Sequence, residues 1–129
     1  MRHMLLVYET GERPHPDSAE GQQAMEEHAA FMEECLRRGA FVAADPLIEP
    51  SGARTVRTRD GEPIVSDGPF AETREWLGGY YILDCEPEEA LELAARCPGG
   101  SDEAAIEVRR ILELPGPHAD VRTGRRSMR

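Results

Sequence analysis

The chain has 129 residues, of which 25 are acidic and 15 are basic, and it carries a formal net charge of −10. This length suits one domain with a single hydrophobic core. All fifteen basic residues are Arg, so chemistry that needs a lysine, such as a Schiff base or a Lys-bearing phosphate loop, is excluded. The acidic balance argues against direct binding of nucleic acid or of an anionic membrane, because both need a basic face.

The cysteines and the N-terminus predict a cytoplasmic protein. Cys35, Cys85 and Cys97 cannot all pair within the chain and have no metal-binding spacing, so we expect free thiols in a reducing compartment. The apolar stretch at residues 4–8 is too short for a signal peptide, and no segment approaches the ~20 apolar residues of a membrane span. The isolated histidines support no metal site, and we expect no cofactor.

The first third of the chain predicts a strand, a long helix and a second strand. Residues 3–9 are strand formers that end at Thr10-Gly11. Asp17 and Glu20 have the spacing of a capping box at the start of a helix, and Gly39 is a natural left-handed cap at its end. Residues 41–44 follow as a short strand that Asp45-Pro46 interrupts. The helix is amphipathic, and the residues of its apolar face are Met25, His28, Ala29, Phe31, Met32, Cys35 and Leu36.

The remainder of the chain predicts a hairpin, a strand, a helix and a last strand. Residues 53–59 and 63–66 flank the turn signal Asp60-Gly61. Residues 80–85 form the most convincing strand, and the second helix begins near Pro87 and stops before Pro98-Gly99-Gly100. Residues 105–112 form the last strand. This order predicts an α+β, ferredoxin-like fold, in which an antiparallel sheet has both helices on one face.

The uncovered face of that sheet predicts a homodimer that buries sheet against sheet. Two helices cover one side only, and the strands hold more apolar positions than one helical layer needs: Leu5, Val7, Val42, Val56, Ile82 and Ile106. We place the domain at residues 1–114. Residues 115–129 form a basic tail of about +3, which leaves about −13 on the rest of the chain. A flexible, solvated tail is the simpler expectation, and a tail that binds a specific acidic partner is the alternative.

The most distinctive motif lies at residues 65–82. It consists of the turn Asp67-Gly68-Pro69-Phe70 and the segment Trp76-Leu77-Gly78-Gly79-Tyr80-Tyr81. The motif resembles the signature of the YCII-related family, in its DGPF-domain branch. The opening residues 4–8, His28 and Gly39 agree with this resemblance, which spans about residues 1–114. The chain departs from the branch at Arg74, where Lys is usual, and at Asp45-Pro46, where Gly-Glu is more typical.

The resemblance implies a ferredoxin-like subunit in a dimeric α/β barrel. It also implies a His–Asp pair at a cleft of the subunit, which in this chain would be His28 and Asp67. The activity stays open, because only the elimination of chloride from a chlorinated hydroxyquinol is associated with the wider family. Genes of the DGPF branch often lie near those of sigma factors.

The residues alone point to the same pair. His28 lies centrally on an apolar helix face, where its ring needs a hydrogen-bond partner, and Asp67 lies in a turn that can aim a side chain at a pocket. Such a dyad can abstract a proton from a substrate. The structural alternative is that His28 is an ordinary core histidine and that Asp67 only caps its own turn.

Three further residues are candidates for substrate binding. Glu72 can supply a second carboxylate, Arg57 can bind a carboxylate or phosphate, and Tyr81 can line an aromatic pocket. Their structural alternatives are a solvated charge, protection of a strand edge and core packing.

Two functions are therefore expected. The first is a cofactor-independent lyase or isomerase that acts on a small molecule, with His28 as base and Asp67 as its orienting group. The second is a non-catalytic, small-ligand-binding or regulatory dimer linked to transcription.

Overall fold

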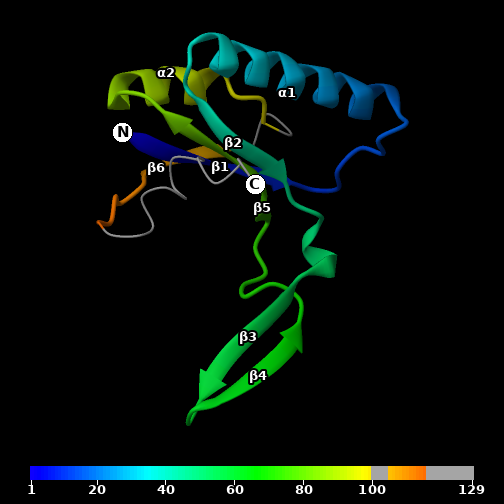
Figure 1. Cartoon of the computed structure of the whole chain (residues 1–129). Coiled ribbons are helices and arrows are strands. Elements are labelled where there is room, and N and C mark those ends of the chain that lie inside the picture. Colours follow the sequence, from blue (N-terminus) through cyan, green and yellow to red (C-terminus); the bar gives the residue numbers. More distant parts are fainter. Residues whose placement is uncertain (100–104, 116–129) are drawn as a thin grey trace, which may run out of the picture.

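The computed structural model describes residues 1–99 and 105–115. Strands β2, β5, β1 and β6 form one antiparallel sheet in that order, and β3 and β4 form a separate two-stranded sheet. Both helices cover the same face of the larger sheet (Figure 1). The predicted α+β, ferredoxin-like arrangement is confirmed. The elements are β1 (Arg2–Thr10), α1 (Ala19–Arg37), β2 (Phe41–Pro46), the short 3₁₀ helix η1 (Pro50–Gly52), β3 (Arg54–Arg59), β4 (Glu62–Asp67), β5 (Glu75–Asp84), α2 (Pro87–Arg96) and β6 (Ala105–Arg110).

Helix α1 begins and ends close to the predicted positions. Its N-cap is Ser18, one residue after the expected Asp17, because the Ser18 hydroxyl accepts the Gly21 N–H at 3.0 Å. Gly39 follows the C-cap with a φ of +71°, as a left-handed cap requires.

The buried face of α1 is narrower than predicted. Gly21, Phe31 and Cys35 are buried, whereas Met25 and Leu36 are exposed. On a helical wheel the three buried residues lie within about 80° of one another, and the two exposed residues lie outside this arc. His28 lies within the arc and is half-buried.

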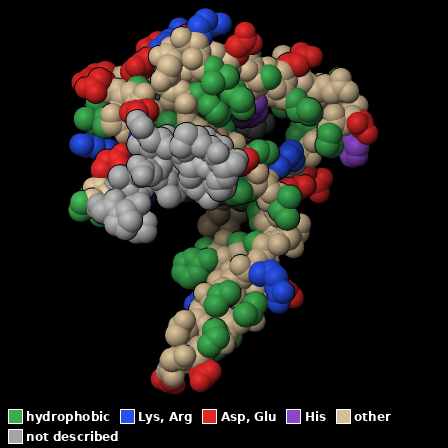
Figure 2. All heavy atoms as spheres, in the orientation of Figure 1, with side chains coloured by type: hydrophobic (Ala, Val, Ile, Leu, Met, Phe, Trp, Pro, Cys, Tyr) green, Lys and Arg blue, Asp and Glu red, His purple; other side chains and the backbone are tan. Residues whose placement is uncertain are grey.

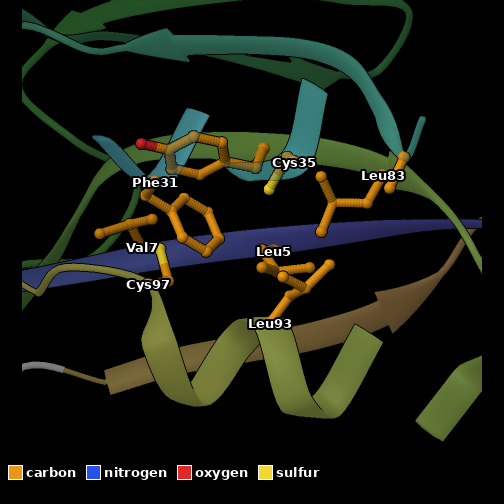
Figure 3. Packing of buried hydrophobic residues seen from close by; sticks show 9 residues of the cluster. Leu5, Val7, Phe31, Cys35, Leu83, Leu93 and Cys97 are labelled. Carbon is orange, nitrogen blue, oxygen red and sulfur yellow. The ribbon is translucent and has the colours of Figure 1, made fainter. Parts of the chain in front are cut away.

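The hydrophobic core lies between the sheet and the two helices (Figure 3). Leu5 and Leu83 from the central strands meet Leu93 from α2, and all three are fully buried. The ring of Phe31 packs edge-on against that of Tyr81, with centroids 4.9 Å apart. This packing fixes α1 over β5 and so decides what lies beside His28.

The sheet face opposite the helices carries a different set of residues from the predicted one. Leu5 pairs with Val108 and Val7 with Ile106, so these four side chains share the helix-covered face. Val42 lies at the irregular start of β2, and Val56 lies on β3, outside the sheet. Of the six predicted residues, the register places only Ile82 on the open face. Its apolar neighbours there are Met4, Leu6, Tyr8, Ala43 and Tyr80.

The predicted hairpin forms, but it leaves the main sheet. Asp60 and Gly61 have φ values of +53° and +82°, as a tight hairpin turn requires. At its base the Gly68 N–H donates to the Ala53 carbonyl at 2.8 Å. The hairpin, residues 53–68, projects away from the helices as a free-standing extension (Figure 1), and we refer to it as the arm.

Three strand boundaries differ from those predicted by two residues or more. β5 begins at Glu75 rather than at residue 80 and so includes Gly78 and Gly79. β2 continues through Asp45-Pro46, which an edge strand tolerates because one side needs no N–H donors. β6 ends at Arg110. The predicted tail lies outside the described residues apart from Pro115.

Among the described residues, no helix has the length and apolar character needed to cross a membrane.

Candidate functional site

The structure joins His28 of α1 to Tyr81 of β5. The Nδ1 atom of His28 lies 2.6 Å from the Tyr81 hydroxyl oxygen, and the two rings are nearly parallel with centroids 6.0 Å apart. Two of the five site residues predicted from the sequence, one catalytic and one substrate-binding, therefore belong to one site. They meet because Phe31, one helical turn after His28, docks on the same tyrosine ring.

Burial keeps both members of this pair neutral. It lowers the pKa of His28 and raises that of Tyr81, since each charged form would lose solvation. The Tyr81 hydroxyl has no other hydrogen-bond partner among the described residues, so the neutral pair is satisfied when it donates to Nδ1. In that state the imidazole proton lies on Nε2.

The second ring nitrogen of His28 is available to a ligand. Nε2 makes no hydrogen bond with any described residue. In the described part of the chain, the buried side-chain polar atom without a partner is Nδ1 of His3, so Nε2 of His28 is not fully buried. Nε2 is therefore the atom that can exchange a proton with a bound molecule.

Two carboxylates raise the pKa of His28, that of Glu9 more than that of Glu27. Among the charged residues near His28, Glu9 has the largest effect on the pKa of the imidazole and raises it, whereas Arg13 lowers it. Glu9 Oε2 accepts a hydrogen bond from Arg13 Nη2 at 2.7 Å, and its side chain is only 14% exposed. The pair lies beside Gly78, where any side chain would collide with the Glu9 carboxylate.

Arg13 ties this site to the base of the arm. Its guanidinium donates to the Leu47 carbonyl at 2.7 Å and to the Gly78 carbonyl at 3.0 Å. The Leu47 N–H also donates to the Gly78 carbonyl at 2.8 Å. The Arg13 guanidinium lies 5.1 Å from the centroid of the Trp76 ring. Arg13 therefore holds together the segments that enter and leave the arm.

Sequence reasoning missed Glu9 and Arg13. In β1, Leu5 and Val7 face the helices, and Glu9 continues the same alternation. A charged residue at an inward-facing position of a strand is unusual, and this pattern could have identified Glu9 as a functional candidate. Arg13 lies in a loop, where sequence spacing gives no indication of its partners.

Asp67 does not meet His28 within the described chain. It ends β4, its side chain is 94% exposed, and it forms an ion pair with Arg54 Nε at 3.3 Å. The pairing of His28 with Asp67 therefore stays a prediction, and it would require a second copy of the chain or another position of the arm.

The other two predicted binding residues also lie outside the His28 site. The Arg57 guanidinium packs over the Phe70 ring, 4.9 Å from its centroid. Glu72 is exposed in the loop between the arm and β5. A surface hollow of about 330 Å³ lies elsewhere, and none of the predicted site residues lines it: its walls are Tyr8, Thr73, Glu75, Ala105, Ile106 and Glu107. Within residues 1–99 and 105–115, no cluster of His, Cys, Asp and Glu could hold a metal ion.

Comparison with known proteins confirms the family resemblance. An uncharacterized protein of Rhizobium meliloti (strain 1021) is 38% identical over 76 residues, which cover 58% of this chain and 61% of the relative. The match thus spans about three fifths of the relative's length. Residues 1–115 match the family model described as the YCII-related domain. The chain belongs to the YCII-related family.

Proposed function

We propose that the chain binds a small molecule at Nε2 of His28 and catalyses a proton transfer on it without a cofactor, as a lyase or isomerase does. The observation that carries this proposal is the 2.6 Å contact between Tyr81 and Nδ1, which leaves Nε2 unpaired. A half-buried histidine with one nitrogen fixed and the other open is suited to general acid–base catalysis.

The Tyr81 hydroxyl can serve both protonation states of the imidazole. When it donates to Nδ1, the neutral imidazole carries a proton on Nε2 and can donate a hydrogen bond to a substrate oxygen. When the hydroxyl turns and accepts from a protonated Nδ1, the Nε2 lone pair is free to take a substrate proton. Giving a proton at one substrate atom and taking one from another is the cycle that an isomerisation or an elimination requires.

Glu9 supports the charged intermediate of that cycle. Once Nε2 has taken a proton, the imidazolium is stabilised by the Glu9 carboxylate, which raises the pKa of His28. Burial opposes this effect and lowers the same pKa, so the proton is readily returned. His28 thereby stays neutral at rest and charges only during the reaction.

The surroundings of His28 favour an uncharged substrate with a ring or a carbonyl group. Phe31 and Tyr81, both buried, make the surroundings of the imidazole aromatic and largely uncharged. The Arg13 guanidinium is already bound to Glu9 and to two backbone carbonyls, so it has little capacity left for a ligand carboxylate. Enolisable carbonyl compounds and hydroxylated aromatic rings fit this environment.

The cysteines supply no competing nucleophile. All three are free thiols, and burial raises the pKa of Cys35 to about 11 and that of Cys97 to about 12. Few thiolates therefore exist at neutral pH. Free thiols also support the proposal that the protein works in the reducing cytoplasm.

The test measures proton exchange directly. The protein is incubated in D₂O with a panel of enolisable ketones, 2-oxo acids and dihydroxybenzenes, and deuterium incorporation is followed by proton NMR. We expect His28→Gln to lower the exchange rate by about 10²–10⁴-fold and Tyr81→Phe to lower it by a smaller factor. His15→Gln, at an exposed histidine, is the matched control and should keep the full rate.

The same samples distinguish catalysis from binding alone. Compounds that shift the His28 ring signals without exchanging deuterium would contradict the enzyme proposal. They would instead support a non-catalytic, small-ligand-binding or regulatory protein linked to transcription.

A further inference from the structure

The arm exposes apolar side chains on both of its faces. Val56 and Val65 are paired across the hairpin and share one face, and Ile64 lies on the other beside the Phe70–Arg57 stack. All four of these apolar side chains are exposed, Phe70 by 74%. Figure 2 shows hydrophobic side chains along the projecting arm. In water, such an arrangement leaves apolar area unburied.

The arm also lacks extensive contact with the other elements that the structure describes. β3 and β4 pack on each other and make no extensive contact with another described element. An isolated two-stranded hairpin is marginally stable in water at best. The segments that lead into and out of the arm, by contrast, are held together by Arg13 and by the Leu47–Gly78 hydrogen bond. A marginally stable hairpin with apolar side chains on both faces is therefore a candidate surface for binding a partner.

The direction of the arm brings it past the open face of the main sheet. The helices lie on one side of the main sheet, and the arm runs toward the other side, past the open face (Figure 1). The centre of that face is apolar, with Met4, Leu6, Tyr80 and Ile82. Any molecule that covers the open face therefore lies within reach of the arm.

The area of the open face indicates why the arm is needed. Four strands about 4.8 Å apart and about six residues long give a footprint of about 400 Å². A stable interface buries roughly 800 Å² per partner. One face of the arm, two strands wide and six residues long, adds about 200 Å². In a two-fold dimer each chain buries one face of its own arm and also the surface that the partner's arm covers. With the open face, the area buried per chain then reaches about 800 Å².

We propose that the arm of each chain packs against the body of a second copy, so that the two arms clasp the face-to-face dimer that the family resemblance implies. The clasp goes beyond the proposed function and does not depend on it, because it involves neither His28 nor Tyr81. Val56 and Val65 form the contact face, since they are the directly opposed apolar pair of the arm.

Excision of the arm tests the clasp. Ala53 and Gly68 are joined by a 2.8 Å hydrogen bond, so residues 54–67 can be replaced by two glycines without separating the ends. Sedimentation equilibrium from nanomolar to high micromolar concentration should show a dimer for the full chain. The excised protein should be a monomer or a dimer at least about 30-fold weaker, as loss of a central contact implies. Circular dichroism and thermal unfolding establish that it is folded.

Point variants locate the contact without removing the arm. Val56→Asp should weaken the dimer by a similar factor, and Leu91→Asp on α2 is the matched control. The two side chains are 63% and 61% exposed, so the cost of the charge within one chain is alike. A full chain that is monomeric throughout would overturn the proposal. So would a dissociation constant that neither excision nor Val56→Asp changes.

Discussion

The carboxylate of Glu9 occupies the space that a side chain at Gly78 would fill. Glu9 is held there by Arg13 Nη2 at 2.7 Å, so it cannot move aside without breaking an ion pair that is mostly screened from solvent. The glycine in the middle of β5 is thus explained by the charged residue on the neighbouring strand β1. This relationship connects the family motif at residues 65–82 to the His28 site.

Gly78→Ala is expected to destabilise the protein by about 1–3 kcal/mol, the usual cost of forcing extra volume into a packed site. Urea unfolding measures the change. Gly52→Ala is the control, because a methyl group there meets only the end of the exposed Ile48 side chain. We expect that change to stay within about 0.5 kcal/mol. Equal effects of the two substitutions would show that Glu9 does not constrain residue 78.

Glu9→Gln is expected to lower the pKa of His28. The Glu9 carboxylate is the charged group that raises this pKa most, and its removal leaves the smaller opposing effects of Glu27, which raises the pKa, and Arg13, which lowers it. Gln keeps the size of the side chain and an oxygen that Arg13 can bind. The imidazole titration followed by NMR gives the pKa directly.

Asp67→Asn is the comparison for Glu9→Gln. Asp67 is exposed and pairs with Arg54, so within one chain its charge should leave the pKa of His28 unchanged. A fall in the pKa of His28 in the dimeric protein would instead show that Asp67 of a second copy reaches the imidazole. A fall with Asp67→Asn and none with Glu9→Gln would contradict the assignment of Glu9.

Much of the fold was predictable because its signals are local. Gly39 and Asp60-Gly61 adopt the positive φ values that their positions in the sequence indicate. The open face was assigned less well, since one residue of register decides which side a strand residue takes. Leu5 and Val7 were expected on the open face but face the helices, and Met4 and Leu6 lie on the open face instead.

The site was only half predictable. His28 could be found as a polar residue on an apolar helix face. Its pairing with Tyr81 joins positions 53 residues apart and depends on how α1 docks on β5. Asp67 was a reasonable candidate from its turn, but the arm carries it away from the sheet. No local signal could reveal that, because turn residues determine the hairpin itself and not its direction relative to the main sheet.

The stability of the protein should depend on the protonation of His28. Burial makes its pKa lower in the folded chain than the value near 6.5 of the unfolded chain. Below about pH 6.5 the unfolded chain therefore binds more protons than the folded chain. As the pH is lowered, the free energy of unfolding decreases until the pH is below the pKa of His28 in the folded chain. His28→Gln removes this contribution. The stability of the wild type relative to His28→Gln should be greatest above pH 7 and decrease toward pH 5, as measured by urea unfolding at each pH.

A wild-type advantage over His28→Gln that grows toward pH 5 would mean that the folded protein favours the imidazolium. That result would contradict the burial argument.

Arg13→Gln is expected to loosen the base of the arm. The substitution shortens the side chain and removes the charge that pairs with Glu9, and with it the donors to the Leu47 and Gly78 carbonyls. The Leu47 N–H donates to the Gly78 carbonyl, and in the variant neither Leu47 nor Gly78 is held by the residue 13 side chain any longer. Its hydrogen exchange should become faster, because exchange reports local opening. Arg59→Gln, near the tip of the arm, is the control and should leave Leu47 unchanged. If the amide of Leu47 exchanges equally in both variants, then the backbone hydrogen bonds alone hold the arm, and Arg13 serves only to pair with Glu9.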